Sequence, residues 1–83
     1  MRQVFRIVAV PDPQTLPRII AIFAQRSLVP TTMSSHRHSA MLHIEIELDH
    51  LDPPIAAIIA AKLGEGVLID SVVCDTLLSL QVA

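Results

Sequence analysis

The sequence predicts an α+β sandwich in which two helices cover one face of a four-stranded antiparallel sheet, within one domain of 83 residues. Three observations support this prediction. Residues 41–50 alternate between apolar and polar side chains, as in a strand with one buried face. Segments 16–27 and 53–63 instead repeat apolar residues at helical spacing. Strand-like segments before, between and after them complete the order βαββαβ of the ferredoxin-like fold class.

The first strand is expected over residues 3–10, where both faces are largely apolar, as in the centre of a sheet. Phe5, Ile7 and Ala9 form one of these faces. The Pro-Asp-Pro segment that follows ends the strand, because proline cannot donate a hydrogen bond to a neighbouring strand.

The first helix has two candidate N-caps, Asp12 and Thr15. With Asp12 as the cap, Pro17 would fall past the first turn and remove a hydrogen bond, whereas Thr15 places Pro17 safely inside the first turn. Thr15 is therefore preferred. Ile22 lies near the polar side of this helix and is a candidate contact residue. The face expected to be buried consists of Leu16, Ile19, Ile20, Phe23 and Ser27.

A polar edge strand is expected over residues 29–38, because Pro30 interrupts any pairing on one side. Val29, Thr31 and Met33 share one side of it. A turn near residues 39–40 leads into the strictly alternating strand. Its core-facing residues are Leu42, Ile44, Ile46 and Leu48.

The second helix is expected to begin at Asp52 as the N-cap, followed by proline at the first helical position. Lys62 is expected in the last turn, where a positive charge interacts favourably with the helix dipole. Gly64 is expected to adopt the left-handed conformation that ends the helix. The expected buried stripe is Ile55, Ile58, Ile59 and Leu63. The last strand covers residues 67–75. The domain is thus assigned to residues 1–76, with an apolar tail at 77–83 and the strand order fourth, first, third, second.

Composition predicts that the domain covers part of its surface with another chain. Hydrophobic residues make up 52% of the sequence and the mean hydropathy is +0.57. A domain this small buries only roughly 60% of the surface that its unfolded chain exposes. The net charge of −2 and the scattered basic residues argue against nucleic acid and membrane partners. A single cysteine and the lack of a leader-like segment favour a reducing, cytoplasmic setting.

Histidines provide the best candidate for a metal site. His36 and His38 are two apart on one strand and share a face, and His43 can approach from the neighbouring strand. No carboxylate or thiolate completes a recognisable ligand spacing, so a polar hairpin on the solvent-facing side is the preferred interpretation. No metal is predicted.

No catalytic residue is predicted either. Cys74 lies in an apolar strand with no basic neighbour in sequence to activate it. Glu45 and Glu47 belong to a solvated strand face, and the two glycines do not form a phosphate loop. RNA-binding sheets of this class stack bases on exposed aromatics, but the third expected strand offers none and the net charge is negative. Copper chaperones need a Cys-x-x-Cys loop after the first strand, and that loop here reads Pro-Asp-Pro-Gln-Thr. No cofactor is expected.

Five segments, in this order, resemble a known family: 12–20, 22–26, 44–48, 62–63 and 72–74. The first reads Asp-Pro-Gln-Thr-Leu-Pro-Arg-Ile-Ile. Over residues 3–74 the chain resembles an ACT domain and, more specifically, the short single-domain small subunit of acetolactate synthase.

The resemblance implies a non-catalytic regulatory subunit that activates a large thiamine-diphosphate-dependent subunit of branched-chain amino-acid biosynthesis. It also implies an amino-acid effector between paired domains, held by the loop after the first strand and by the neighbour's second strand. The implied partners are a second copy, the large catalytic subunit, or both. The implied ligand-binding residues are Asp12, Gln14, Thr15, Leu16, Val29 and Thr31, and the interface residues are Ile22, Val29 and Met33.

The chain departs from the family at the ligand site, because Pro11, Gln14 and Val29 stand where Asn, Gly and Asn are usual. Pro11 has no N–H, Gln14 adds bulk where glycine admits a ligand, and Val29 has no side-chain amide. The charged ends of an amino acid therefore lose partners, and assembly and activation are expected in place of valine feedback. The alternative is a free-standing dimeric sensor of an amino acid or another small molecule.

Overall fold

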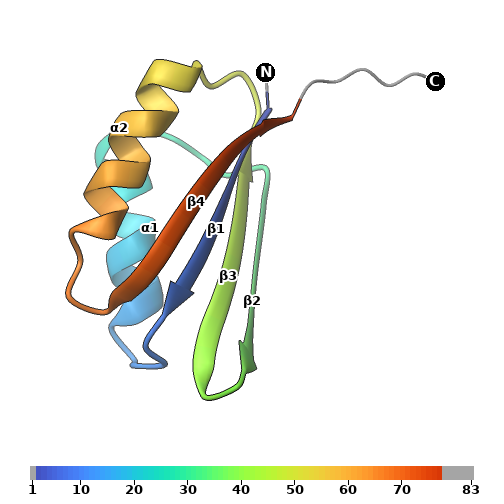
Figure 1. Cartoon of the computed structure of the whole chain (residues 1–83). Helices are drawn as coiled ribbons and strands as arrows, with labels where there is room; N and C mark the ends of the chain where they lie inside the picture. Colours follow the sequence, from blue (N-terminus) through green and yellow to red (C-terminus); the bar gives the residue numbers. More distant parts are fainter. Residues whose placement is uncertain (1, 78–83) are drawn as a thin grey trace.

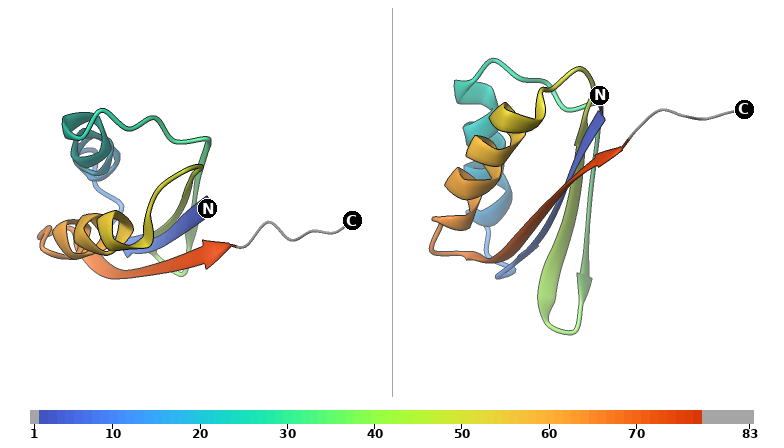
Figure 2. Two further views of the ribbon diagram at one scale, coloured as in Figure 1. Left: turned by 90° about the horizontal axis from the view of Figure 1, so that it is seen from above. Right: turned by 45° about the horizontal axis from the view of Figure 1, so that its top comes forward.

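The computed structural model describes residues 2–77 and confirms the predicted order of elements (Figure 1). The sheet has the order β2-β3-β1-β4, all pairs are antiparallel, and both helices lie on one face (Figure 2). Neither helix in this part of the chain has the length and apolar run needed to cross a membrane. The elements are β1 (Arg2–Ala9), α1 (Thr15–Gln25), β2 (Thr32–His38), β3 (Met41–Leu48), α2 (Pro53–Gly64) and β4 (Ile69–Leu77).

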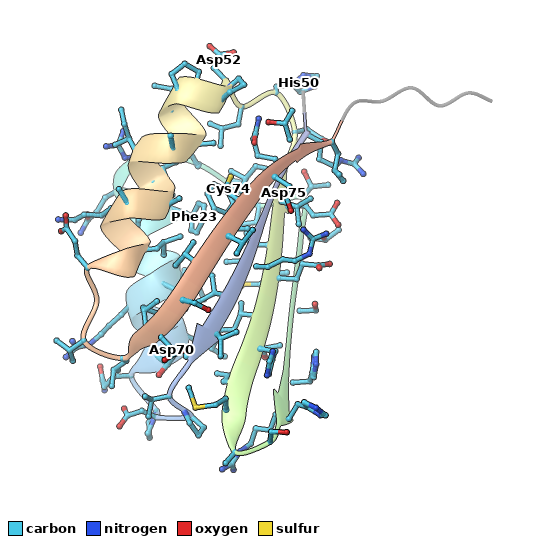
Figure 3. All side chains as sticks on the ribbon, in the orientation of Figure 1. Phe23, His50, Asp52, Asp70, Cys74 and Asp75 are labelled. Atoms are coloured by element: carbon cyan, nitrogen blue, oxygen red, sulfur yellow. The ribbon has the colours of Figure 1, made fainter. Side chains whose placement is uncertain are left out.

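The core lies between the helices and the central strands β1 and β3. Phe5 of β1 meets Phe23 of α1 edge to face, with ring centroids 5.4 Å apart, and Phe23 lies between the helical layer and the sheet (Figure 3). Each fully buried Leu or Ile contributes on the order of 1.5–3 kcal/mol. The strand faces predicted from alternation are confirmed. The core residues on β1, β3 and the helices include Ile7, Ala9, Ile19, Ile44, Ile46, Leu48, Ala56, Ile59 and Leu63.

One buried polar side chain, Gln3, joins three parts of the fold. Its Nε2 donates to the carbonyl oxygen of Leu51, 3.3 Å away. Its Oε1 accepts from Thr76 Oγ1 at 3.0 Å and from Cys74 Sγ at 3.7 Å. The side chain of Gln3 is only 1% exposed, and both its amide nitrogen and its amide oxygen have hydrogen-bond partners.

The N-cap of helix α1 lies one residue before the predicted cap. Gln14 is the N-cap, and the Thr15 hydroxyl does not cap the helix but donates to the carbonyl of Val10 at 2.6 Å. Pro17 lies in the first turn, as predicted, where its missing N–H costs no helical bond. The predicted burial of Ile20 is wrong: its exposure is 47%, because the buried row runs through Thr15, Ile19 and Phe23.

The prediction that Ser27 belongs to the buried face of α1 is wrong. Ser27 is exposed and adopts a left-handed conformation with φ 58° directly after the helix. Its N–H bonds to Ala24, and the N–H of Leu28 bonds to Phe23. Ser27 therefore ends the helix and is not a core residue.

Helix α2 begins at the predicted N-cap but buries a different stripe. Asp52 is the cap and Pro53 the first helical residue. Ile55 and Ile58, predicted to be buried, are 38% and 50% exposed, and Ala56 takes the inward place at 1%. Because nearly every residue of α2 is apolar, its periodicity does not select one face.

The end of α2 differs from the prediction as well. Gly64 lies in the last turn of the helix and has no left-handed backbone, and Glu65 is the C-cap. Lys62 is in the last turn, as predicted. No glycine in the described chain has a positive φ, so the end of this helix does not depend on glycine freedom.

The two outer strands begin later than predicted. Strand β2 starts at Thr32, so Val29 and Thr31 belong to the connection before it. Strand β4 starts at Ile69, because a turn closed by the bond from the Ile69 N–H to Gly66 leaves Val67 outside the sheet. Leu77, predicted as the start of a tail, is the last residue of β4. The rest of that predicted tail lies outside the described residues.

A two-residue turn joins β2 to β3. Ser39 and Ala40 have φ values of 53° and 65°, and the strands pair directly from His38 to Met41. Both residues thus lie in the left-handed region that tight hairpins of this kind require and that glycine or asparagine usually fill. The turn predicted at these residues is confirmed, although neither serine nor alanine favours a left-handed backbone.

The strand faces can be tested by two neighbouring substitutions in β3. Ile44→Asp places a charge at a site that is 2% exposed, which costs on the order of 3–5 kcal/mol and unfolds so small a domain. Glu45→Ala removes only an exposed partner of Arg6, which costs less than about 1 kcal/mol. Thermal unfolding followed by circular dichroism measures both. Equal melting temperatures for the two variants would contradict the assigned faces.

Candidate functional site

The loop between β1 and α1 holds the first group of predicted ligand residues. The N–H of Val10 bonds to the carbonyl of Leu68 at 2.8 Å, which ties the loop to the start of β4. The Asp12 carboxylate accepts the N–H of Gln14 at 2.8 Å, and its carbonyl accepts the N–H of Thr15 at 3.0 Å. The loop is therefore an ordered turn in which Asp12 already serves a local bond.

The predicted ligand residues in this loop differ in accessibility. Asp12 and Gln14 are exposed, whereas Thr15 is 1% exposed and its hydroxyl is committed to Val10. Leu16 is half-buried and packs against the core. Only the first two side chains can meet a ligand without rearrangement of the loop.

The second group, Val29 and Thr31, lies at the opposite end of α1 (Figure 1). The N–H of Thr31 bonds to Glu47, which pairs with Val4 near the start of β1. The loop follows the other end of β1, about 20 Å away for six residues of strand. One copy of the chain therefore does not bring the two groups together.

The predicted interface residues are also separated. Val29 is 85% exposed and Met33 37% exposed. Ile22, expected near the polar side of α1, is half-buried and packs against the core. It lines a small apolar pocket between α1 and the loop before β4, together with Thr15, Arg18 and Val67.

That apolar pocket has a volume of ≈ 40 Å³. Small-molecule sites usually measure about 300–1,000 Å³, so this pocket has room for the end of an aliphatic side chain and not for a whole amino acid. Its walls are almost entirely apolar, and Arg18 is the charged residue among them.

The sheet face away from the helices carries ion pairs beside apolar residues such as Val73, which is 53% exposed. Arg6 donates to Glu45 at 3.2 Å and to Asp75 at 2.6 Å, across three strands. Arg2 bonds to Asp49 at 2.8 Å, which raises the pKa of Arg2 and lowers that of Asp49. These pairs are exposed and contribute little stability each, and they link strands that lie side by side.

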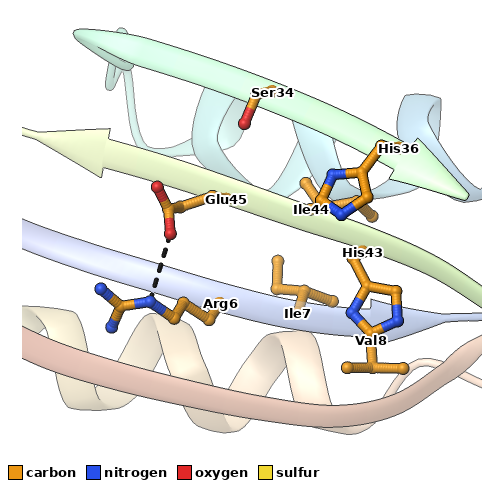
Figure 4. A pocket seen from close by; sticks show the side chains of 8 residues that line it. All are labelled: Arg6, Ile7, Val8, Ser34, His36, His43, Ile44 and Glu45. Carbon is orange, nitrogen blue, oxygen red and sulfur yellow. Dashed lines mark hydrogen bonds and ion pairs between the residues drawn. The ribbon is translucent and has the colours of Figure 1, made fainter. Parts of the chain in front are cut away.

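An open hollow of ≈ 250 Å³ lies on the same face (Figure 4). The Arg6–Glu45 pair and Ser34 line one end, and Val8, His36 and His43 line the other. Because Arg6 is shared by two carboxylates, the hollow has no surplus positive charge for an anion.

The three histidines converge as their spacing predicts. His36 stacks on His43 with ring centroids 5.7 Å apart, and His38 meets His43 edge to face at 5.7 Å. Across residues 2–77, however, no three His, Cys, Asp or Glu side chains are arranged to hold a metal ion. The cluster is a cross-strand aromatic contact on an exposed hairpin.

Cys74 lies on β4 and is half-buried (Figure 3). Burial, and to a smaller extent the charge of Asp75, raises the pKa of its thiol. Its Sγ donates to Gln3 Oε1 at 3.7 Å. A thiol held protonated in this way is a structural residue and a weak nucleophile.

Sequence reasoning missed the two residues that organise the polar contacts, Gln3 and Arg6. For Arg6 a signal was present, because it lies among apolar residues of a central strand and needs a carboxylate on each neighbouring strand. For Gln3 no sequence signal distinguishes a buried amide from an exposed one, since its partners come from Leu51 and Thr76.

Comparison with known proteins agrees with this architecture. The family model described as ACT-like domain matches residues 1–81. No curated protein matches the chain at a significant level.

Solved structures share the fold at low sequence identity. The ACT domain from GTP pyrophosphokinase of Chlorobium tepidum has a TM-score of 0.76 and 11% identity, over 89% of this chain and 96% of that one. The C-terminal domain of the MgtC protein from Mycobacterium tuberculosis has a TM-score of 0.69 and 11% identity, over 89% of this chain and 84% of that one. A formyltetrahydrofolate deformylase from Pseudomonas putida KT2440 has a TM-score of 0.66 and 15% identity, over 92% of this chain and 29% of that one. At these identities the similarity shows the fold alone.

The low reactivity expected of the Cys74 thiol can be tested by alkylation. Because its thiol is half-buried and its pKa is raised, iodoacetamide at pH 8 should modify native protein much more slowly than protein unfolded in urea. Mass spectrometry over a time course measures both rates. A native rate equal to or above the unfolded one would indicate an activated thiol and contradict the structural role.

Proposed function

We propose that this chain, which belongs to the ACT-like domain family, is a non-catalytic regulatory small subunit of an acetolactate-synthase-like enzyme. In this role it binds and activates a large thiamine-diphosphate-dependent subunit in branched-chain amino-acid biosynthesis. The resemblance of residues 12–20, 22–26 and 44–48 to short small subunits supports the specific partner.

The observation that carries the proposal is the uncovered helix-facing side of β2. Met33 pairs with Ile46, which is fully buried, and therefore points to the same side of the sheet as the core. Yet all seven residues of β2 are exposed. This side, with nearby Val29 at 85% exposure, needs cover from another chain.

The chemistry of the described residues supports a non-catalytic role. Cys74 is held protonated, the histidines form no metal site, and the carboxylates near them pair with arginine. The side chains of Cys74 and Thr76 both donate to the amide oxygen of Gln3 and not to a histidine or a carboxylate.

The alternative, a free-standing dimeric sensor, gains support from the apolar pocket beside the β1–α1 loop. Its ≈ 40 Å³ accepts the end of an aliphatic side chain, and Arg18 at its wall offers a partner for a carboxylate. The rest of such a ligand would need contacts from a second copy, because Val29 and Thr31 lie at the far end of α1.

The proposal is tested by co-expression with a large acetolactate-synthase-type subunit. We expect co-purification and a higher specific activity than that of the large subunit alone. Met33→Asp should weaken association by about tenfold or more, because it puts a charge into the covered side of β2. Val73→Asp, on the opposite sheet face at 53% exposure, is the matched control and should activate normally. No association and no rate change with the native chain would reject the proposal.

The sensor alternative is tested by a melting screen against the twenty amino acids. A ligand that binds only the folded chain raises its stability by RT ln(1 + [L]/Kd), about 2.7 kcal/mol at 100 times Kd. A rise with an aliphatic amino acid that Arg18→Ala abolishes would favour the sensor. A flat screen, together with activation of the large subunit, favours the regulatory subunit.

A further inference from the structure

The open hollow on the sheet face is a channel that runs across three strands, and we call it the cross-strand channel (Figure 4). Its walls are two rows of side chains, and each row has one member on β2, one on β3 and one on β1. The first row is Ser34, Glu45 and Arg6, and the second row, two residues farther along each strand, is His36, His43 and Val8.

The floor of the cross-strand channel is the main chain of Ile7 and Ile44. These two residues pair with each other between the two rows. Their side chains are buried in the core, because successive residues of a strand point to opposite faces of the sheet. The open face therefore has no side chain on β1 or β3 between the rows, and the alternation of these two strands creates the channel.

The width of the channel suits one flat ring. Rows that are two residues apart on a strand are separated by about 6.5–7 Å. A ring midway between them lies about 3.5 Å from each wall, which is close to the contact distance between carbon atoms. The volume of ≈ 250 Å³ is just below the range of about 300–1,000 Å³ for small-molecule sites. The channel therefore has room for a bicyclic ring and for little more.

Both walls offer flat side-chain groups. The Arg6 guanidinium donates from Nε to Glu45 at 3.2 Å and from Nη1 to Asp75 at 2.6 Å, so it is held in place. On the other wall the rings of His36 and His43 are within 14° of parallel, with centroids 5.7 Å apart. Guanidinium and imidazole groups both stack on aromatic rings. A flat ring in the channel is therefore placed between two kinds of stacking group.

The charges of the channel favour a neutral ring that donates a hydrogen bond. Arg6 brings one positive charge, whereas its partners Glu45 and Asp75 bring two negative charges, so an anionic ring is disfavoured. Glu45 accepts from Arg6 through Oε2, which leaves Oε1 for a ligand N–H. Among the natural aromatic rings, indole interacts best with a cation such as a guanidinium.

We propose that the cross-strand channel binds an indole-type ring, which is bicyclic, neutral and carries one N–H donor. The ring lies between Arg6 and His43, and its N–H donates to Glu45 Oε1. Because one side of the channel is open to water, binding is weak, with a Kd on the order of millimolar. The channel lies on the sheet face opposite the covered side of β2, so this inference does not depend on the proposed catalytic partner.

Proton NMR of the full chain during a titration with indole tests the site. The imidazole C–H signals of His36 and His43 should shift, with one shared saturation curve, because the ring current of indole acts on its neighbours. His50, which follows the far end of β3, is the internal control and should not shift (Figure 3). Cyclohexanol is similar in size but not flat, and it should shift none of them. Equal shifts of all three histidines, or no saturable shift, would overturn the proposal.

Two histidine variants test the wall of the channel by equilibrium dialysis. The chain contains no Trp or Tyr, so indole fluorescence reports the ligand alone. His43→Val should weaken indole binding by about tenfold or more, because it removes the stacking group and keeps a strand-forming residue. His38→Val is the matched control, since His38 contacts His43 on the same hairpin but does not line the channel. It should bind within about twofold of the native chain.

Circular dichroism shows whether both variants fold, and the titration of the native chain decides alone if His43→Val does not. Equal affinities for two folded variants would place the ring elsewhere and reject the proposal.

A third ligand identifies the source of the ring. N-acetyltryptophanamide carries indole on a capped main chain. If it binds as tightly as indole or more tightly, the channel accepts a tryptophan side chain of another polypeptide. If it binds about fivefold more weakly or worse, the channel accepts a free small molecule.

Discussion

The position of β1 between β3 and β4 is the constraint on which the rest of the structure depends. Its helix-facing residues Phe5, Ile7 and Ala9 form the floor of the core, and its hydrogen bonds run to both neighbours. On the same strand, Gln3 reaches Leu51 and Thr76, and Arg6 reaches carboxylates on both adjacent strands. Apolar packing supplies the stability, and these two polar side chains add bonds between neighbouring strands.

A sandwich with helices on only one face leaves its two sides with different surfaces. The open sheet face is exposed to water, and its charged side chains form ion pairs with one another, such as Arg6 with Glu45. Exposed apolar residues occur on both sides, at Met33 and Ile58 on the side of the helices and at Val73 on the open sheet face.

The fold was predictable because β3 alternates without a break and the helical segments have clear starting signals at Pro17 and Pro53. The buried face of α2 was not predictable, since a helix with isoleucines and alanines all around offers several equivalent stripes, and packing against the sheet chose Ala56 over Ile58. The candidate ligand site was only partly predictable. The family resemblance pointed to the Asp12–Thr15 loop and to Val29, but the distance between them is a property of the fold.

The hairpin turn at Ser39 and Ala40 bears on the order in which the chain folds. Left-handed backbone costs roughly 1–2 kcal/mol per residue without glycine, so this turn does not nucleate its own hairpin. The pairing of β2 with β3 must outweigh this cost for the edge strand to form. The edge that we expect to meet a partner thus rests on its pairing with a single neighbour, because its own turn opposes it.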